Sequence, residues 1–188
     1  VLQIRSVELA AKYKLPLHVR SSFDPVEGTR VVSQESLYDG GSAMEQVVVA
    51  GVAADSAQTK LTLQSVPDAP GVAAKVFGAL SAAAIVVDII VQDIPANGTL
   101  TVSFTVGKTD QLKARQVLDQ LKASTFPSMK IVEEKDLAKV SIVGVWMQHH
   151  PGVASKMFAL LAEAGINIVL ITTSEINVSC LIAESQVK

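Results

Sequence analysis

Residues 70–90, PGVAAKVFGALSAAAIVVDII, recur in degenerate form at residues 151–171 as PGVASKMFALLAEAGINIVLI. The offset is 81 residues throughout, and ten of the twenty-one aligned positions are identical without any insertion. The chain therefore contains two copies of one supersecondary unit. A period of this length indicates paired small domains, because the repeats of solenoid proteins usually span about 20–50 residues. We expect such a pair to share a ligand site at its interface.

The composition of the chain argues against several classes of protein. Of the 188 residues, 49% are hydrophobic and only 4% are aromatic, so the cores must consist mainly of aliphatic side chains. The net charge of −2 gives no electrostatic reason to expect binding to nucleic acid or to an anionic membrane. We expect neither a signal peptide nor a transmembrane helix, which needs about 20 apolar residues. The single Cys180, expected to be a buried small hydrophobe, fits a reducing, cytoplasmic compartment.

The first 46 residues lie outside the repeat and carry a different pattern. An apolar helical patch at residues 7–13 stops before Pro16, and short strand candidates follow at residues 17–19 and 29–32. Residues 33–46, SQESLYDGGSAMEQ, are polar and lack periodicity, which predicts a linker.

The first repeat, assigned to residues 47–135, predicts the element order βαββαβ. The helix that begins after Gly71 has apolar residues about every four positions, and the second helix has Thr109 or Asp110 as its expected cap. In that second helix Leu112, Val117, Leu118 and Leu121 are expected to face inward. The predicted strands are residues 60–66, 86–91, 99–106 and 129–133, with a hairpin turn at residues 95–98.

The second repeat, assigned to residues 136–188, begins in the same way. A strand at residues 139–145 precedes a loop and a helix at residues 153–164, in which Met157, Leu160, Leu161 and Ala164 are expected to face inward. Strands at residues 167–172 and 177–182 follow, but a last helix and strand are missing from the repeat as written. The β-branched run at residues 47–53 is a candidate for the missing strand. The charged run at residues 133–136 is expected to be a solvated connection between the repeats.

The motifs of both repeats resemble the tandem ACT domains of aspartate kinases. In the first repeat the resemblance rests on a strand followed by D-x-P-G, a helix and A-x-I-x-V-D-x-I-V-Q. In the second repeat it rests on HPGVASKMF, LAEAGINI and TSEI. The opening VLQIRSVELAAKYKLPLHVRSSF resembles the last helix and strand of the aspartate kinase catalytic domain. The resemblance covers nearly the whole chain outside the linker. It implies an α+β protein with two ferredoxin-like βαββαβ units, preceded at residues 1–32 by a short tail of an α/β kinase domain.

The resemblance also implies a function. ACT domains of this family bind end-product amino acids, chiefly lysine or threonine, and pair across subunits. We therefore expect an allosteric regulatory part of aspartate kinase that mediates feedback inhibition in aspartate-family amino-acid biosynthesis. Its expected partners are lysine or threonine, a second copy of the chain and the catalytic domain. The phosphate-binding motifs of the kinase are missing, so we expect no catalysis, no metal site and no cofactor in this chain, with ATP and magnesium belonging to the catalytic domain. A structural dimerisation module with vestigial effector sites is the alternative.

The start of the first-repeat helix has the chemistry that an amino-acid carboxylate requires. Free backbone N–H groups and the positive end of the helix dipole meet at Gly71, which lets a ligand approach the backbone closely. Asp68 and Gln92 offer acceptors for the ammonium group. The alternative is that D-x-P-G is only a strand-to-helix turn with Asp68 as its cap. The expected effector-binding residues are Asp68, Pro70, Gly71, Val72, Ala73, Gln92, His150, Gly152, Val153, Ala154, Asn167, Ile168, Ser174 and Glu175.

Several of these residues carry open alternatives. In the second repeat, the loop at residues 148–154 is expected to face Asn167 and Ile168. Ser174 and Glu175 either meet a lysine ammonium or form a hydrogen-bonded strand turn. His149 and His150 are taken as a polar loop pair, because no third ligand stands at metal spacing.

Two positions depart from the pattern of the family. Val86 replaces the usual asparagine at the position equivalent to Asn167, and Asp93 follows Gln92 where asparagine is usual. The first change removes a polar contact and the second adds a negative charge, so one of the two effector sites is expected to be altered.

Overall fold

The computed structural model describes residues 3–32, 49–93, 98–144 and 152–187. By its internal contacts the chain divides into two compact units, residues 1–46 and residues 47–188. The linker predicted at residues 33–46 and the turn predicted at residues 95–98 lie wholly or almost wholly outside the described residues.

The first unit is a helix followed by a small hairpin. Helix α1 (Ile4–Lys12) precedes strands β1 (Leu17–Val19) and β2 (Thr29–Val31), which pair antiparallel, as the sequence predicts. Within the described part of this unit only Ala10 is a buried hydrophobic residue. Large apolar side chains are instead exposed, namely Leu9, Tyr13, Leu15, Val19, Phe23 and Val26. The unit therefore presents apolar surface that its own elements do not cover.

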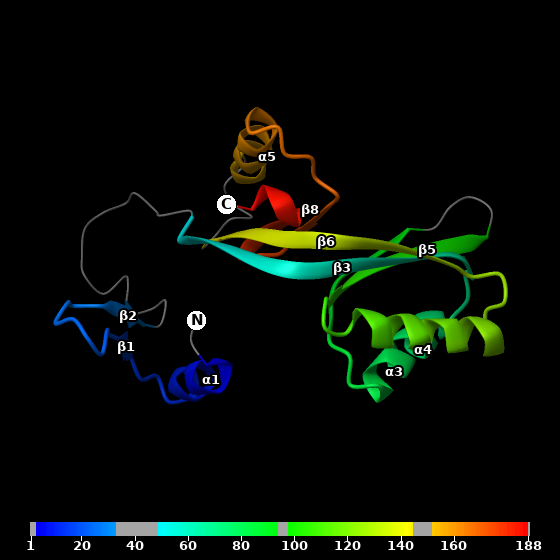
Figure 1. Cartoon of the computed structure of the whole chain (residues 1–188), viewed down its shortest axis with the longest axis horizontal. Coiled ribbons are helices and arrows are strands. Elements are labelled where there is room, and N and C mark those ends of the chain that lie inside the picture. The colour runs from blue at the N-terminus through cyan, green and yellow to red at the C-terminus, as the bar shows by residue number, and fades with distance from the viewer. Residues whose placement is uncertain (1–2, 33–48, 94–97, 145–151, 188) are drawn as a thin grey trace. The chain divides into compact units, whose positions relative to one another are not determined.

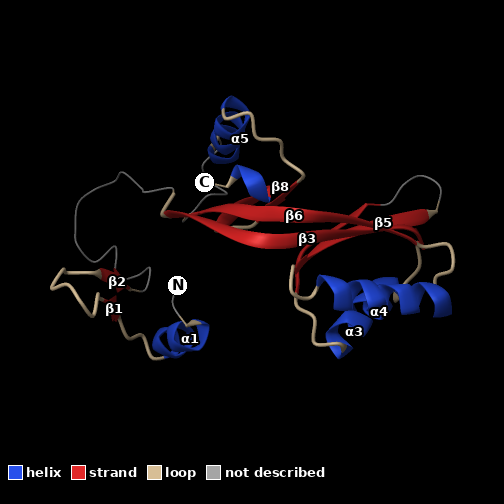
Figure 2. Ribbon diagram, viewed as in Figure 1, coloured by secondary structure: helices blue, strands red, loops and turns tan. Residues whose placement is uncertain are grey.

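The second unit is built on one antiparallel sheet of six strands, in the order β4-β5-β3-β6-β8-β7 (Figures 1 and 2). Helices α3 and α4 pack beneath one end of the sheet in this view, and α5 packs against the other end. The strands are β3 (Gly51–Pro67), β4 (Val87–Asp93), β5 (Thr99–Gly107), β6 (Lys130–Val143), β7 (Leu170–Thr173) and β8 (Asn177–Ala183). The helices are α3 (Val72–Ala82), α4 (Gln111–Ser124) and α5 (Val153–Glu163), followed at the end by the short 3₁₀ helix η2 (Glu184–Gln186).

Strands β3 and β6 run through both repeats, where the sequence predicted shorter, separate strands. They remain paired from Gly51↔Val143 to Gln64↔Lys130. One bulge at Ala57 (φ 66°) in β3 and one at Asp136 (φ 54°) in β6 offset each other, so the register is the same on both sides. The charged run at residues 133–136, expected to be a solvated connection between the repeats, is therefore part of strand β6, in which Lys135 and Asp136 are exposed. Glu134 in this run forms a 2.7 Å ion pair with Lys60.

The first repeat has the strand order β4-β5-β3-β6 with α3 and α4 on one face, which is the ferredoxin-like arrangement. Its core contains Leu61 and Phe104, both fully buried, and the ring of Phe77 meets Phe104 edge-on at 5.4 Å. Leu118 of α4 is buried as predicted, but Leu112 is 74% exposed. Asp110 is the residue before α4, but its side chain makes no capping hydrogen bond.

The second repeat has the equivalent order β7-β8-β6-β3, with α5 packed on it. Its fourth strand is the first half of β3, since residues 51–55 pair with residues 139–143. The strand that was missing from the second repeat is thus supplied by a segment that precedes the first repeat in the sequence. Cys180 is fully buried in this core, and burial raises the pKa of its thiol.

The second repeat shows one helix on its sheet within the described residues, whereas the first shows two. Beside α5 an apolar hollow of about 760 Å³ remains open, lined by Val49, Val52, Val140, Ile142, Gly152, Val153, Lys156, Met157, Leu160 and Leu161. Leu160, expected to face inward, is 56% exposed there. At the repeat offset of 81 residues, Leu160 is equivalent to a position of α3 that faces α4 in the first repeat.

Candidate functional site

The start of α3 is an open helix terminus formed by residues 68–73. Gly71 is the N-cap residue with φ 88°, and no side chain caps the helix. The alternative that Asp68 is the cap is therefore wrong, and its exposed carboxylate is not used in this turn. A Cβ at Gly71 would meet no atom within 4 Å, so glycine is required here for its backbone conformation.

Backbone donors at this terminus are available to a ligand. The Val72 N–H donates to the Ala69 oxygen at 3.3 Å, and the Lys75 N–H donates to the Gly71 oxygen at 3.0 Å. The described residues provide no hydrogen-bond acceptor for the N–H of Ala73, which is exposed. Free first-turn N–H groups together with the helix dipole favour a carboxylate. Pro70 is exposed, whereas Val72 is buried in the core and holds the helix in place.

Gln92 lies at the same end of the sheet as this terminus. Asp68 N–H approaches the Gly98 oxygen at 3.4 Å, and Gly98 directly precedes β5, the strand with which β4 pairs. Gln92 is opposite Val102, a buried core residue, so it is on the sheet face that carries α3. The exposed amide of Gln92 and the free donors of α3 therefore belong to one surface.

The second repeat reproduces this terminus. Gly152 is the N-cap of α5 with φ 104°, and Lys156 N–H donates to its oxygen at 2.8 Å, as Lys75 does to Gly71. Val153 and Ala154 are half-buried against the second core. His150 lies outside the described residues. The two glycines are separated by the repeat offset of 81 residues, so the repeat preserves the terminus itself.

Asn167 and Ile168 lie at the other end of α5 from Gly152. Gly152 precedes α5 and Asn167 follows it, and the eleven residues of α5 rise by about 16 Å. Gly152 and Asn167 therefore lie at opposite ends of α5 within one chain. Residues 148–151 of the loop lie outside the described residues, so the expectation that the loop faces Asn167 and Ile168 stays a prediction. Val86 is separated from Gly71 by α3 in the same way. Asn167 is exposed and Ile168 is half-buried near the sheet edge formed by β7.

Ser174 and Glu175 lie in the turn between β7 and β8. The Ser174 hydroxyl oxygen accepts hydrogen bonds from the N–H of Ile176 at 3.4 Å and of Asn177 at 3.2 Å. The hydrogen-bonded turn, one of the two alternatives for this pair, is thus present. Glu175 is exposed, and its carboxylate extends from a turn that the serine stabilises.

An ion pair that the sequence analysis did not predict joins the two repeats. Lys139 of β6 donates to the carboxylate of Asp88 on β4, and Ile89 N–H donates to the same carboxylate at 2.9 Å. Burial raises the pKa of Asp88, but the hydrogen bonds from Lys139 and Ile89 lower it, and the net pKa is below its ordinary value. A positive charge in the second repeat thereby holds a carboxylate of the first repeat in its ionised form.

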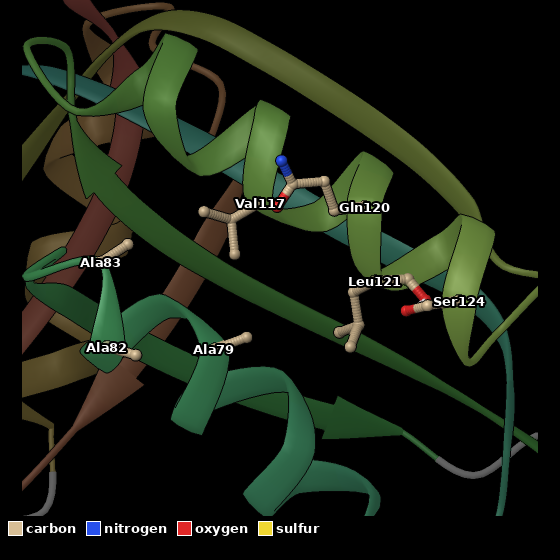
Figure 3. A pocket seen from close by; sticks show the side chains of 7 residues that line it. All are labelled: Ala79, Ala82, Ala83, Val117, Gln120, Leu121 and Ser124. Carbon is tan, nitrogen blue, oxygen red and sulfur yellow. Dashed lines mark hydrogen bonds between the residues drawn. The ribbon is translucent and has the colours of Figure 1, made fainter.

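Two further hollows lie in the second unit. One of about 410 Å³ lies between α3 and α4, where Ala79, Ala82 and Ala83 face Val117, Gln120, Leu121 and Ser124 (Figure 3). Its lining carries no charged side chain. The other, of about 370 Å³, is at the junction of the repeats and includes Asp55, Gln58, Asp88 and Asp110.

The described residues contain no group of three or more histidine, cysteine, aspartate or glutamate side chains placed to hold a metal ion. Within the same ranges, no helix is long and apolar enough to cross a membrane.

Comparison with known proteins agrees with this architecture. A family profile described as ACT domain matches residues 64–121 and 140–188, one match in each repeat. The chain is 45% identical over 184 residues to an aspartokinase of Pseudomonas aeruginosa, covering 98% of this chain and 43% of that protein. The chain thus spans less than half the length of this relative.

Two solved structures extend the comparison. The ligand-free regulatory subunit of aspartate kinase from Thermus thermophilus matches with a TM-score of 0.68 at 39% identity, over 73% of this chain and 90% of that chain. Aspartokinase III of E. coli, in complex with lysine and aspartate in the T-state, matches with a TM-score of 0.69 at 27% identity, over 98% of this chain and 39% of that chain. The chain belongs to the ACT-domain family and has the tandem ACT architecture of aspartate kinase regulatory regions.

Proposed function

We propose that the chain is the amino-acid-sensing part of an aspartate kinase and mediates feedback inhibition of that enzyme by lysine or threonine. The observation that carries the proposal is the open start of α3, where Gly71 holds a left-handed conformation and no side chain caps the helix, with Gln92 at the same end of the sheet. These groups match the two charged ends of an amino acid. The carboxylate takes the backbone donors, and the ammonium takes the oxygens of Gln92 and Asp68.

A complete site in this proposal needs a second copy of the chain. Strands β4 and β7 are the two edges of the six-stranded sheet, so Gln92 and the residues beside β7 are far apart within one chain. In a dimer, Asn167 and Ile168 of one copy approach the terminus at residues 68–73 of the other. Effector binding at that interface favours one quaternary arrangement, and a coupling of about 1–3 kcal/mol is enough for strong inhibition.

Lysine and threonine are the two candidate effectors. The E. coli relative was crystallised in complex with lysine and aspartate. Lysine carries a second ammonium group, which threonine lacks. The two amino acids are therefore distinguished by direct titration.

The first unit fits a role as the end of the kinase catalytic domain. Its exposed side chains, Leu9, Tyr13, Leu15 and Phe23 among them, form apolar surface of the kind that packs against a larger domain. In this proposal the unit transmits the arrangement of the ACT domains to the catalytic domain, in which ATP and magnesium would bind.

The second candidate function is a dimerisation module whose effector sites are vestigial. Val86, an exposed valine where an asparagine would offer a hydrogen bond, is the observation that favours it. Under this alternative the chain forms dimers but binds neither amino acid.

Calorimetric titration with L-lysine and L-threonine separates the two functions. The proposal predicts saturable binding of at least one of them, weakened by about 1–3 kcal/mol in Gln92→Ala because a buried partner of the ligand is lost. The matched control is Gln120→Ala, which removes an exposed glutamine from α4 and should leave the affinity unchanged. Unchanged affinity in Gln92→Ala would remove Gln92 from the site, and no binding at all would favour the dimerisation module.

A further inference from the structure

Strand β4 contains one residue more than its partner strand, and that residue is strained. The register is Val87↔Val106 and Asp88↔Thr105 on one side of Ile89, and Ile90↔Phe104 onward on the other. Ile89 itself has no partner and adopts φ 35°. Positive φ is a genuine outlier for a β-branched residue, and such conformations persist only where surrounding contacts enforce them.

The contacts that enforce this bulge converge on Asp88. The Ile89 N–H, which the bulge removes from the ladder, donates to the Asp88 carboxylate at 2.9 Å. The other carboxylate oxygen of Asp88 accepts a hydrogen bond from the Lys139 ammonium. The Ile89 side chain is buried, with 9% exposed, which further fixes the strand.

Lys139 reaches Asp88 from the other repeat. Its strand, β6, is separated from β4 by β3 and β5, a span of roughly 14 Å in a flat sheet. The contact therefore requires the curvature that the bulges near Ala57 and Asp136 introduce at the junction of the repeats. A contact across this span links the geometry of β4 to the second repeat.

The bulge decides which side chain of β4 faces the start of α3. In the observed register Gln92 is opposite Val102, on the face that carries α3, and Asp93 is opposite Thr101 on the other face. Without the extra residue Gln92 would pair with Thr101 and Asp93 with Leu100. A shift by one residue moves each side chain to the opposite face, so Asp93 would take the place of Gln92.

We propose that Lys139 and Asp88 are positioning residues, whose ion pair holds the Ile89 bulge and so directs Gln92, and not Asp93, toward the ligand terminus of α3. The pair thereby lets the second repeat control the charge of the first repeat's site. The inference rests on the proposed effector function for its purpose, but the register of β4 can be measured without any effector.

The test traps the register with a disulfide in the full chain. Val91 and Ser103 are directly opposite in the observed register, at the separation that a cross-strand disulfide accepts. Val91→Cys with Ser103→Cys should therefore cross-link rapidly under mild oxidation, read by mass spectrometry. In a shifted register residue 91 would be opposite residue 102 and the cross-link would form slowly. Cys180 is fully buried and is kept in every variant.

Four backgrounds give the comparison. Lys139→Met and Asp88→Asn should each move the ratio of the two registers about fivefold toward the shifted register, the change expected from a partly exposed ion pair, and so slow the cross-link. Lys139→Arg should restore the rate. Asp55→Asn is the matched control, because Asp55 lines the same hollow and pairs with Lys139 in the sheet, but its carboxylate bonds Gln58 instead.

The outcomes separate this inference from the proposed function. Equal cross-linking in Lys139→Met, Asp88→Asn and the control would overturn the positioning role, whatever the chain binds. Titration with L-lysine and L-threonine then adds a second readout, since a shifted register should weaken binding although Gln92 is unchanged. If the unmodified chain binds neither amino acid, the effector function is wrong, while the cross-linking rates still decide the role of the pair. Circular dichroism of each variant excludes loss of the fold as the cause of slow cross-linking.

Discussion

The substitution of glycine by alanine at Gly71 and at Gly78 should change the stability of the protein in opposite directions. Both glycines are exposed, and at both a Cβ would meet no atom within 4 Å, so steric overlap contributes nothing. Gly71 has φ 88°, where an L-residue is disfavoured by about 1–2 kcal/mol. Alanine also lowers the conformational entropy of the unfolded chain, which offsets about 0.4–1 kcal/mol of this loss. Gly71→Ala should therefore lower the free energy of unfolding by about 1 kcal/mol. Gly78 lies inside α3, where alanine is favoured by about 0.5–1 kcal/mol.

Urea denaturation followed by circular dichroism measures this difference. The two variants should differ by about 2 kcal/mol in free energy of unfolding, with equal slopes. Gly71→Asn is an internal check, because asparagine tolerates positive φ better than alanine and should recover part of the loss. If Gly71→Ala were as stable as Gly78→Ala, the left-handed cap would not exist in solution, and the argument for an open ligand terminus would lose its basis.

Three further outcomes follow from the same structure. Leu118→Ala should lower the free energy of unfolding by about 2–5 kcal/mol, because Leu118 is fully buried. Leu112→Ala on the same helix should lower it by less than about 0.5 kcal/mol, because Leu112 is 74% exposed. Denaturation of both variants tests this contrast. Because the pKa of Asp88 is lowered in the folded state, Asp88 should stabilise the fold at neutral pH and lose this effect as the pH falls through that pKa, below about 4. In Asp88→Asn the free energy of unfolding should therefore fall less steeply at acid pH. An equally steep fall in both proteins would contradict the Asp88–Lys139 pair. The chain should sediment as a dimer at roughly tens of micromolar, since among the described strands none pairs with the outer edge of β4 or of β7 in one copy; a monomer at that concentration would contradict assembly through the sheet edges.

Periodicity and the internal repeat predict most of the elements of this fold. The spacing of Val72, Val76 and Leu80 predicts α3, and all three are buried. The equivalence of the two repeats predicts that Gly71 and Gly152 have the same role, and both have positive φ at a helix start. These features are local, so they leave a signal in the sequence.

Features that depend on pairing between distant segments were not predictable in this way. The bulges at Ala57 and Asp136 involve no glycine, so nothing in the sequence indicated that β3 and β6 continue through both repeats. Leu112 fits the helical pattern but lies beyond the surface that the sheet covers. Lys139 and Asp88 are 51 residues apart, and only the curvature of the sheet brings their charges together.

The location of the candidate site was predicted in part. The sequence indicated the terminus at residues 68–73 and Gln92, and the structure puts them at one end of the sheet and on one face. Whether Asn167 lies near the loop of its own repeat depends on the path of the chain in three dimensions and could not be read from the sequence. In the structure, Gly152 and Asn167 lie at opposite ends of α5. The side chains that complete the site from a second copy stay a prediction.

The most direct test of the central claim is a heteronuclear NMR titration of the full chain with L-lysine and, separately, L-threonine, with L-alanine as the control. An effector site at the start of α3 predicts saturable shifts for at least one of the two candidates, concentrated in the backbone amides of Gly71 and Ala73 and in the side-chain amide of Gln92. Shifts confined to the apolar hollow beside α5, or no shifts beyond those seen with L-alanine, would contradict it.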